Sequence, residues 1–195
     1  MIVALLRHFP TDWNAEGRLQ GRSDQPLSDA SRAALAGLRL PAGWAGAEMV
    51  ASPLSRAVET ARLLGGPGQP AALEPRLTEF DFGDWEGAAG AALLADPTCA
   101  YRPVEAWGPA FRPPNGESVA ELSARTAAGL AAQAAPGRVF VVHRGVMRAL
   151  LGLASGWAWS GPEPFRIKRA ALHPLRLDAD GRPAEVGAPV KLVPR

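Results

Sequence analysis

Residues 5–21 read LLRHFPTDWNAEGRLQG, and this stretch decides the fold prediction. It continues an apolar run that begins at Ile2 and stops abruptly at Arg7 and His8, with Pro10 just beyond. A short apolar run without a helix cap is typical of a buried strand in a parallel sheet. In open α/β sheets, ligands bind at the carboxyl ends of the strands. The sequence therefore predicts that Arg7 and His8 lie at a ligand-binding edge.

Strand-like and helix-like segments alternate along the rest of the chain. Strands are predicted at residues 48–51, 73–77 and 139–142, and helices at residues 28–40, 53–64, 88–95, 118–134 and 146–153. Residues 166–177, with a turn at Asp180 and Gly181, predict a late strand or hairpin. This alternation is typical of the α/β class. We expect a three-layer α/β/α sandwich around a mostly parallel mixed sheet, formed by residues 1–195 as a single domain.

Charge and cysteine content limit the classes of partner. The formal net charge is +2, only Lys168 and Lys191 are lysines, and no long basic run occurs, so a nucleic-acid partner is not expected. Cys99 is the only cysteine, which fits a reducing compartment. No secretory leader and no stretch of ~20 apolar residues is recognisable. We therefore expect a cytoplasmic protein without a membrane partner, and its oligomeric state stays open, a homodimer included.

Five segments, in this order, resemble the histidine phosphatase superfamily, the phosphoglycerate mutase-like enzymes. One such motif is weak, because an Arg-His pair is common and a strand-end histidine is often structural. Five motifs in order across nearly the whole chain are a specific pattern. They are residues 7–28, 52–61, 77–87, 113–118 and 139–146.

The resemblance implies a site in which a histidine becomes phosphorylated. His8 would be the nucleophile, because a neutral imidazole offers an unprotonated nitrogen near pH 7, and its other nitrogen then needs a carbonyl acceptor. Glu79 falls on the family's general-acid position and would protonate the leaving alkoxide. Arg7 and Arg56 would bind the phosphoryl oxygens through their forked guanidinium groups, with His143, if protonated, as a third cation.

The same resemblance implies the residues that contact the substrate. Asn14 would supply a neutral donor, and Gln20 and Gly21 would line the substrate side of the pocket. The chain departs from the family where Phe9 and Arg144 stand in place of glycines. Phe9 either removes a conformation that glycine permits or adds an aromatic wall, and Arg144 is expected as an extra cation at the rim. The nearby carboxyls that compete with Glu79 for the acid role are Asp81, Asp84 and Glu86.

Residues 98–116 form a long segment with little periodicity but several aromatic side chains, among them Trp107 and Phe111. Loops of this length in compact domains are usually functional or disordered, and the aromatic content favours a packed lid over the pocket. His173 lies outside every motif and is expected to be structural.

Three functions fit these observations. The first is a metal-independent phosphomonoesterase of the small phosphatase branch, which includes alpha-ribazole phosphatase, because the chain lacks the longer insertions of the family's mutases. It would act on a small phosphorylated metabolite and need no cofactor, since the three histidines show no metal-ligand spacing. The second is a phosphoglycerate mutase. The third is a non-catalytic phosphate-binding module, which would be expected to lack His8 or Glu79.

Overall fold

The computed structural model describes residues 1–195 and contains a seven-stranded sheet in the order β4-β3-β5-β1-β6-β7, with β8 also paired to β6. The strands β4, β3, β5 and β1 are parallel, whereas β6 is antiparallel to every strand it pairs with. A second, two-stranded sheet joins β2 to β9. The strands are β1 (Ile2–Arg7), β2 (Leu38–Arg39), β3 (Met49–Ala51), β4 (Ala72–Leu73), β5 (Val139–Val142), β6 (Ala171–Leu177), β7 (Pro183–Val186), β8 (Val190–Lys191) and β9 (Val193–Pro194).

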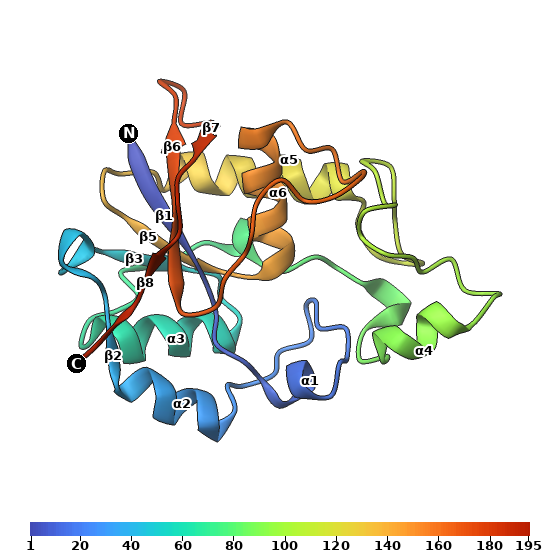
Figure 1. Cartoon of the computed structure of the whole chain (residues 1–195), viewed down its shortest axis with the longest axis horizontal. Helices are drawn as coiled ribbons and strands as arrows, with labels where there is room; N and C mark the ends of the chain where they lie inside the picture. The colour runs from blue at the N-terminus through green and yellow to red at the C-terminus, as the bar shows by residue number, and fades with distance from the viewer.

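Helices cover both faces of the sheet, as Figure 1 shows. Side chains of a strand alternate between the faces, so Val3 and Leu5 of β1 belong to one core and Ala4 and Leu6 to the other. The first core packs against α5 (Val119–Ala132) and α6 (Arg144–Ser155), and the second against α2 (Asp29–Ala36) and α3 (Ser55–Gly65). The predicted three-layer α/β/α sandwich with a mixed sheet is confirmed.

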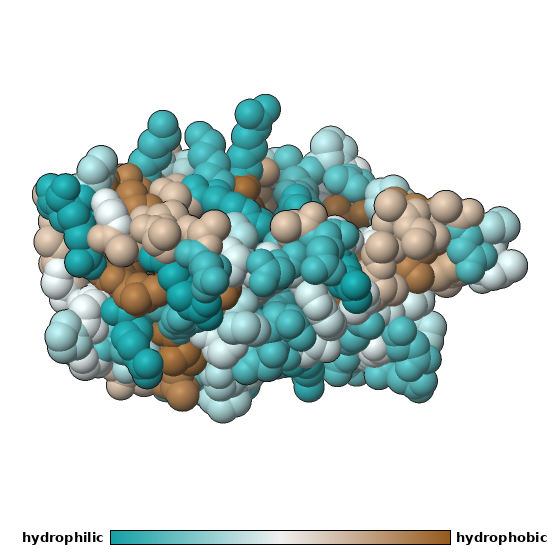
Figure 2. All heavy atoms as spheres, turned by 90° about the horizontal axis from the view of Figure 1, so that it is seen from below, coloured by the Kyte–Doolittle hydropathy of each residue, from teal (hydrophilic) through white to brown (hydrophobic).

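The remaining helices are short. They are α1 (Asp12–Ala15), α4 (Gly90–Ala95) and the 3-10 turns η1 (Ala42–Trp44), η2 (Pro75–Leu77) and η3 (Gly83–Trp85). α4 buries none of its residues, and Leu94 is 52% exposed. Tan and brown atoms accordingly lie at the end of the molecule where α4 is, and further brown atoms lie at the opposite end of the same face (Figure 2). No helix combines the length and the apolar character that crossing a bilayer requires.

Two predicted elements differ from the structure. The helix predicted at residues 28–40 is capped by Ser28 but ends at Ala36, because Leu38–Arg39 pairs with the C-terminal strand β9 instead. The strand predicted at residues 73–77 is only β4, after which Pro75 opens the turn η2. In both places a distant partner or a proline overrides the local apolar pattern.

The helices next to the strand ends begin close to where the sequence places them. α3 begins at Ser55, two residues after Pro53, and its buried face includes Arg56 and Thr60 as well as small apolar side chains. α5 has the expected capping box of Ser118 and Glu121. α6 starts directly after His143, two residues before the predicted start, so the helix follows strand β5 without a loop.

Candidate active site

The carboxyl ends of β1 and β5 lie side by side because these two strands are parallel neighbours. Arg7 is in register with Val142, and the His8 N–H donates to the Val142 carbonyl at 2.9 Å. His8 and His143 each follow the last residue of their strand, so their rings meet with centroids 5.0 Å apart. The sheet thus joins two histidines that are far apart in the sequence.

His8 is held as a neutral imidazole with a defined tautomer. Its Nδ1 lies 2.7 Å from the carbonyl oxygen of Phe9. Since a carbonyl only accepts, Nδ1 carries the proton and Nε2 keeps a free lone pair. Burial, together with the Arg56 and Arg7 guanidiniums, lowers the pKa of His8 well below its usual value. The acceptor that the sequence could not identify is therefore the main chain of the next residue.

The contacts of His143 also favour a neutral imidazole. Arg56 Nε donates to His143 Nδ1 at 3.3 Å, and His143 Nε2 lies 2.8 Å from Ser52 Oγ. A guanidinium has no acceptor, so Nδ1 must be unprotonated. Burial and the Arg56 cation lower the pKa of His143 well below its usual value.

Arg56 contacts His143 and does not line the cavity described below. Its side chain is fully buried, and it donates to the Ser23 carbonyl at 3.0 Å and to the Gly21 carbonyl at 2.7 Å. Gly21 also lies outside the cavity, because its Cα packs so closely against the Phe80 carbonyl and Glu86 that a Cβ would overlap both. Arg56 therefore links the loop after α1, through the Gly21 and Ser23 carbonyls, to His143.

A cavity of about 400 Å³ opens over His8. Asn14 and Gln20 line it, as the resemblance implies. Thr11 Oγ1 and Asn14 Nδ2 both donate to Gln20 Oε1, at 2.7 and 3.4 Å, while Gln20 Nε2 is buried without a partner. The Gln20 amide thus keeps two unused N–H donors at the wall. The charged lining residues are Arg7, Arg18, Arg144, Arg148, Glu79 and Glu105.

Arg7 and Arg144 are the lining cations that no carboxylate neutralises by an ion pair. Arg148 pairs with Glu163, and Arg18 with its neighbour Glu16. Arg7 Nε is buried without a partner, and burial together with the Arg169 and Arg144 guanidiniums lowers its pKa. An unpaired buried cation of this kind gains from a bound anion, so the cavity favours a negatively charged ligand close to His8.

Among the carboxyls of the predicted acid loop, only Glu79 reaches the cavity. Its Oε1 accepts the Phe80 N–H at 2.8 Å, and its Oε2 accepts the Gly145 N–H in the first turn of α6 at 3.0 Å. A Cβ on Gly145 would overlap the Glu79 carboxyl. The other three carboxylates of the loop accept main-chain or side-chain donors away from the cavity: Asp81 from Gly83, Asp84 from Asn115, and Glu86 from Arg22.

The aromatic residues of the pocket divide differently from the prediction. Trp107 is a buried wall residue, but Phe111 stacks behind it, with ring centroids 4.4 Å apart, and does not line the cavity. Phe9 is no wall of this cavity: it lies in the core on the α2 and α3 side, because adjacent residues of an extended chain point to opposite faces. The segment 98–116 therefore packs against the cavity, which it lines with Tyr101, Val104, Glu105 and Trp107.

Sequence reasoning missed several lining residues. Arg148 could have been found, since it lies one helical turn after Arg144 and hence on the same helix face. Trp159 carries no such signal, because only the stacking of its ring on Trp107, with centroids 5.8 Å apart, brings it to the cavity. No group of three or more His, Cys, Asp or Glu side chains that could hold a metal ion comes together in the chain.

Fold and site together define an α/β sandwich with a neutral strand-end histidine at a cavity that also contains unpaired arginines and the Glu79 carboxyl. A family model described as histidine phosphatase superfamily (branch 1) matches residues 3–186. The chain therefore belongs to this superfamily, as its motifs indicate.

Curated relatives match part of their own length. The chain is similar to a probable phosphoglycerate mutase GpmB from Enterobacter sp. (strain 638), at 37% identity over 66% of this chain and 61% of that protein. It is also similar to a glucosyl-3-phosphoglycerate phosphatase from Mycolicibacterium vanbaalenii, at 36% identity over 64% of this chain and 56% of that protein. The match thus spans about six-tenths of the length of these relatives.

Solved structures match the whole chain. TTHB049 from Thermus thermophilus has a TM-score of 0.75 and 32% identity, covering 98% of this chain and 99% of that one. A phosphoglycerate mutase from the same organism has a TM-score of 0.70 and 30% identity, covering 99% and 100%. These likenesses agree with the mixed sheet and its flanking helices.

Proposed function

We propose that this protein is a metal-independent phosphomonoesterase that acts on a small phosphorylated metabolite through a phosphohistidine at His8. The observation that carries the proposal is the state of His8: neutral, with Nδ1 bound to the Phe9 carbonyl and Nε2 free beside the unpaired Arg7. Membership of the histidine phosphatase superfamily, with a phosphatase among the similar proteins, supports it.

The proposed reaction has two steps. His8 Nε2 attacks phosphorus, the ester P–O bond breaks, and Glu79 in its protonated form gives its proton to the departing alkoxide. Water then loses a proton to Glu79 and attacks phosphorus, the N–P bond breaks, and its electron pair returns to Nε2. Arg7 and Arg144 would stabilise the charge on the transferring group in both steps. Arg56 would act outside the cavity, by holding His143 and the loop at Gly21 in place through hydrogen bonds.

Trapping of the intermediate tests the nucleophile. Rapid acid-free quenching with a labelled substrate is expected to place label on His8 that is stable in base and released in acid. His8→Ala should abolish labelling, whereas His173→Ala, which removes a buried histidine of β6 outside the site, should still be labelled. Label on a serine or on His143, or full turnover by His8→Ala, would contradict the proposal.

Leaving-group dependence tests the acid. Glu79→Gln removes the acidic proton but keeps the size of the side chain. The kcat of this variant on an alkyl phosphate should therefore fall about 10²-fold or more. An aryl phosphate such as 4-nitrophenyl phosphate leaves without protonation and should lose far less. Equal losses on the two substrates would remove Glu79 from the acid role and make Glu105, the other carboxyl at the cavity, the next candidate.

A mutase is the second candidate, because a similar protein carries the name probable phosphoglycerate mutase. A mutase returns the phosphoryl group from the histidine to another hydroxyl, whereas a phosphatase passes it to water. Incubation with 3-phosphoglycerate separates these outcomes: 2-phosphoglycerate identifies a mutase, and inorganic phosphate a phosphatase. Tight phosphate binding without turnover of any ester would identify a non-catalytic binding module.

The substrate itself is best found with a panel of phosphate esters. We include alpha-ribazole phosphate because the motifs resemble the small phosphatases, and glucosyl-3-phosphoglycerate because a similar protein is named for its hydrolysis. Sugar phosphates, nucleotides and phosphoglycerates complete the panel. The ester with a kcat/KM at least tenfold above the others is the expected physiological class.

A further inference from the structure

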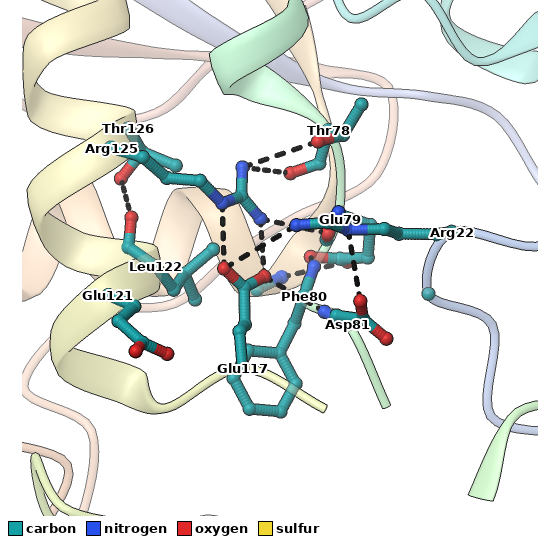
Figure 3. A network of polar contacts seen from close by, with 12 residues as sticks. Arg22, Thr78, Glu79, Phe80, Asp81, Glu117, Glu121, Leu122, Arg125 and Thr126 are labelled. Carbon is teal, nitrogen blue, oxygen red and sulfur yellow. Dashed lines mark hydrogen bonds and ion pairs between the residues drawn. The ribbon is translucent and has the colours of Figure 1, made fainter. Parts of the chain in front are cut away.

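A largely buried ion pair of Glu117 and Arg125 contacts the loop that carries Glu79, outside the cavity (Figure 3). Arg125 Nη2 lies 2.5 Å from Glu117 Oε1, and Arg125 Nε lies 2.8 Å from Glu117 Oε2. Glu117 belongs to the motif at residues 113–118, to which the proposed reaction assigns no role. Arg125 comes from α5, which packs on the other side of the acid loop.

All five N–H donors of Arg125 have an acceptor. Besides the two bonds to Glu117, Nη1 donates to the carbonyls of Arg76 and Thr78, each at 2.7 Å, and Nη2 donates to the Glu79 carbonyl at 2.9 Å. A guanidinium offers five donors in a planar fork, whereas lysine offers three from a single point. Arg125 thus binds the main chain that leads into and includes the proposed acid.

Glu117 holds the other side of the same peptide segment. Its Oε1 accepts the Asp81 N–H at 2.9 Å, and its own N–H donates to the Asp81 carbonyl at 3.2 Å. Glu117 is only 8% exposed, and its charge is neutralised mainly by Arg125, with the Arg22 guanidinium farther away at 3.8 Å. The pair therefore forms hydrogen bonds to the main chain at Glu79 and again two residues later, at Asp81.

We propose that the Arg125–Glu117 pair positions the Glu79 carboxyl for proton transfer. This inference rests on the proposed function, in which Glu79 is the acid. The Glu79 carboxyl itself has one contact within its own loop and one to Gly145 on α6, so the distance between this loop and α6 decides where it lies. The pair sets that distance through the main chain. A displacement of about 1 Å in a catalytic group can cost about 10²-fold in rate.

The test compares two substrates across variants of the pair. Arg125→Lys and Glu117→Gln should lower kcat on an alkyl phosphate about 10- to 100-fold, with a loss under threefold on 4-nitrophenyl phosphate and little change in KM for either. Glu185→Gln is the matched control, because Glu185 pairs with Arg176 on the exposed β6–β7 hairpin. It should leave both rates unchanged. Rates are normalised to the amplitude of histidine phosphorylation, which counts folded sites only.

A double-mutant comparison separates positioning from general stability. If the pair acts through Glu79, adding Arg125→Lys or Glu117→Gln to Glu79→Gln should produce no further loss that is selective for the alkyl substrate. Equal losses on both substrates in the single variants would overturn the inference. Should Arg125→Lys fail to fold, Glu117→Gln, which keeps shape and one acceptor oxygen, decides by the same criterion.

The two proposals fail in different ways. If Glu79→Gln lowers kcat selectively on the alkyl substrate and the variants of the pair do not, the positioning inference is wrong and the acid assignment stands. If Glu79→Gln itself shows no selectivity, the acid assignment is wrong, and the inference falls with it.

Discussion

The tautomer of His8 is set by a single hydrogen bond to the main chain of the next residue. The Phe9 carbonyl keeps the proton on Nδ1, and burial beside two guanidiniums keeps the ring neutral. One of these guanidiniums, that of Arg7, also lines the cavity and favours an anion near the free Nε2. One arrangement of charge therefore has two effects at the residue scale: it lowers the pKa of His8, the proposed nucleophile, and it favours a negatively charged ligand beside it.

Arg144 offers a test of this arrangement, since it is an unpaired cation at the cavity where the family usually has glycine. Arg144→Ala removes one charge-assisted contact to the anion, a contact worth about 1.5–3 kcal/mol. We expect the inhibition constant of inorganic phosphate to rise about tenfold or more, measured by competition against 4-nitrophenyl phosphate. The control is Arg182→Ala, which removes an exposed arginine next to the β6–β7 turn. An unchanged inhibition constant for Arg144→Ala would place this side chain outside the anion site.

At the scale of elements, the junction of β5 and α6 does most of the assembly. The strand brings His143 next to His8, and the helix begins at the very next residue, so the Gly145 N–H in its first turn donates to the Glu79 carboxyl. A helix N-terminus favours a negative or hydrogen-bond-accepting group, which explains why a carboxyl settles there. Gly145 makes the contact close enough, because any side chain would occupy the place of the carboxyl.

Gly145→Ala therefore sets two effects of opposite sign against each other. Alanine favours a helix over glycine by roughly 0.5–1 kcal/mol, but its Cβ overlaps Glu79. We expect the displaced carboxyl to lower kcat on an alkyl phosphate by about tenfold or more, with a smaller loss on an aryl phosphate. Gly43→Ala is the control, since a Cβ there meets nothing within 4 Å. If Gly145→Ala is more stable and equally active on both substrates, the close contact has no role in catalysis.

At the scale of the whole molecule, all three histidines are buried. Burial is the largest cause that lowers the pKa of each: His8, His143 and His173. The folded chain therefore stays unprotonated at pH values where the unfolded chain, with ordinary histidine pKa values of ~6.5, takes up protons. Folding stability must then depend on pH.

The contribution of the buried histidines to the free energy of unfolding should be fully present above about pH 7. It should decrease as the pH drops below ~6.5. In that range the unfolded state binds more protons, so stability rises with pH, by up to about 1.4 kcal/mol per pH unit for each buried histidine. Urea unfolding at pH 5, 6, 7 and 8 measures this slope. His173→Gln should reduce this slope by the equivalent of about one proton, because it removes one of the three buried histidines. His173 lies outside the site, so the substitution leaves His8 and His143 in place. A free energy that is flat between pH 5 and 7 would contradict the neutral state of these histidines.

The sequence by itself determined the sandwich, the strand ends that carry Arg7, His8 and His143, and the family. These features follow from local pattern: apolar runs, caps and motifs whose spacing needs no knowledge of distant contacts. The end of α2 escaped prediction because it depends on the strand β9 at the far end of the chain, which pairs with the residues just after the helix.

Only the tertiary structure decided what each site residue contacts. It placed Arg56 against His143 and the Gly21 carbonyl, made His143 Nδ1 an acceptor for Arg56, and turned Phe9 to the opposite core. It also joined Glu117 and Arg125 around the loop of Glu79. Residue type alone states which donors, acceptors and charges are present. Whether a group binds ligand or protein depends on burial and on the partner that folding brings within about 3 Å, and those are properties of the packed chain.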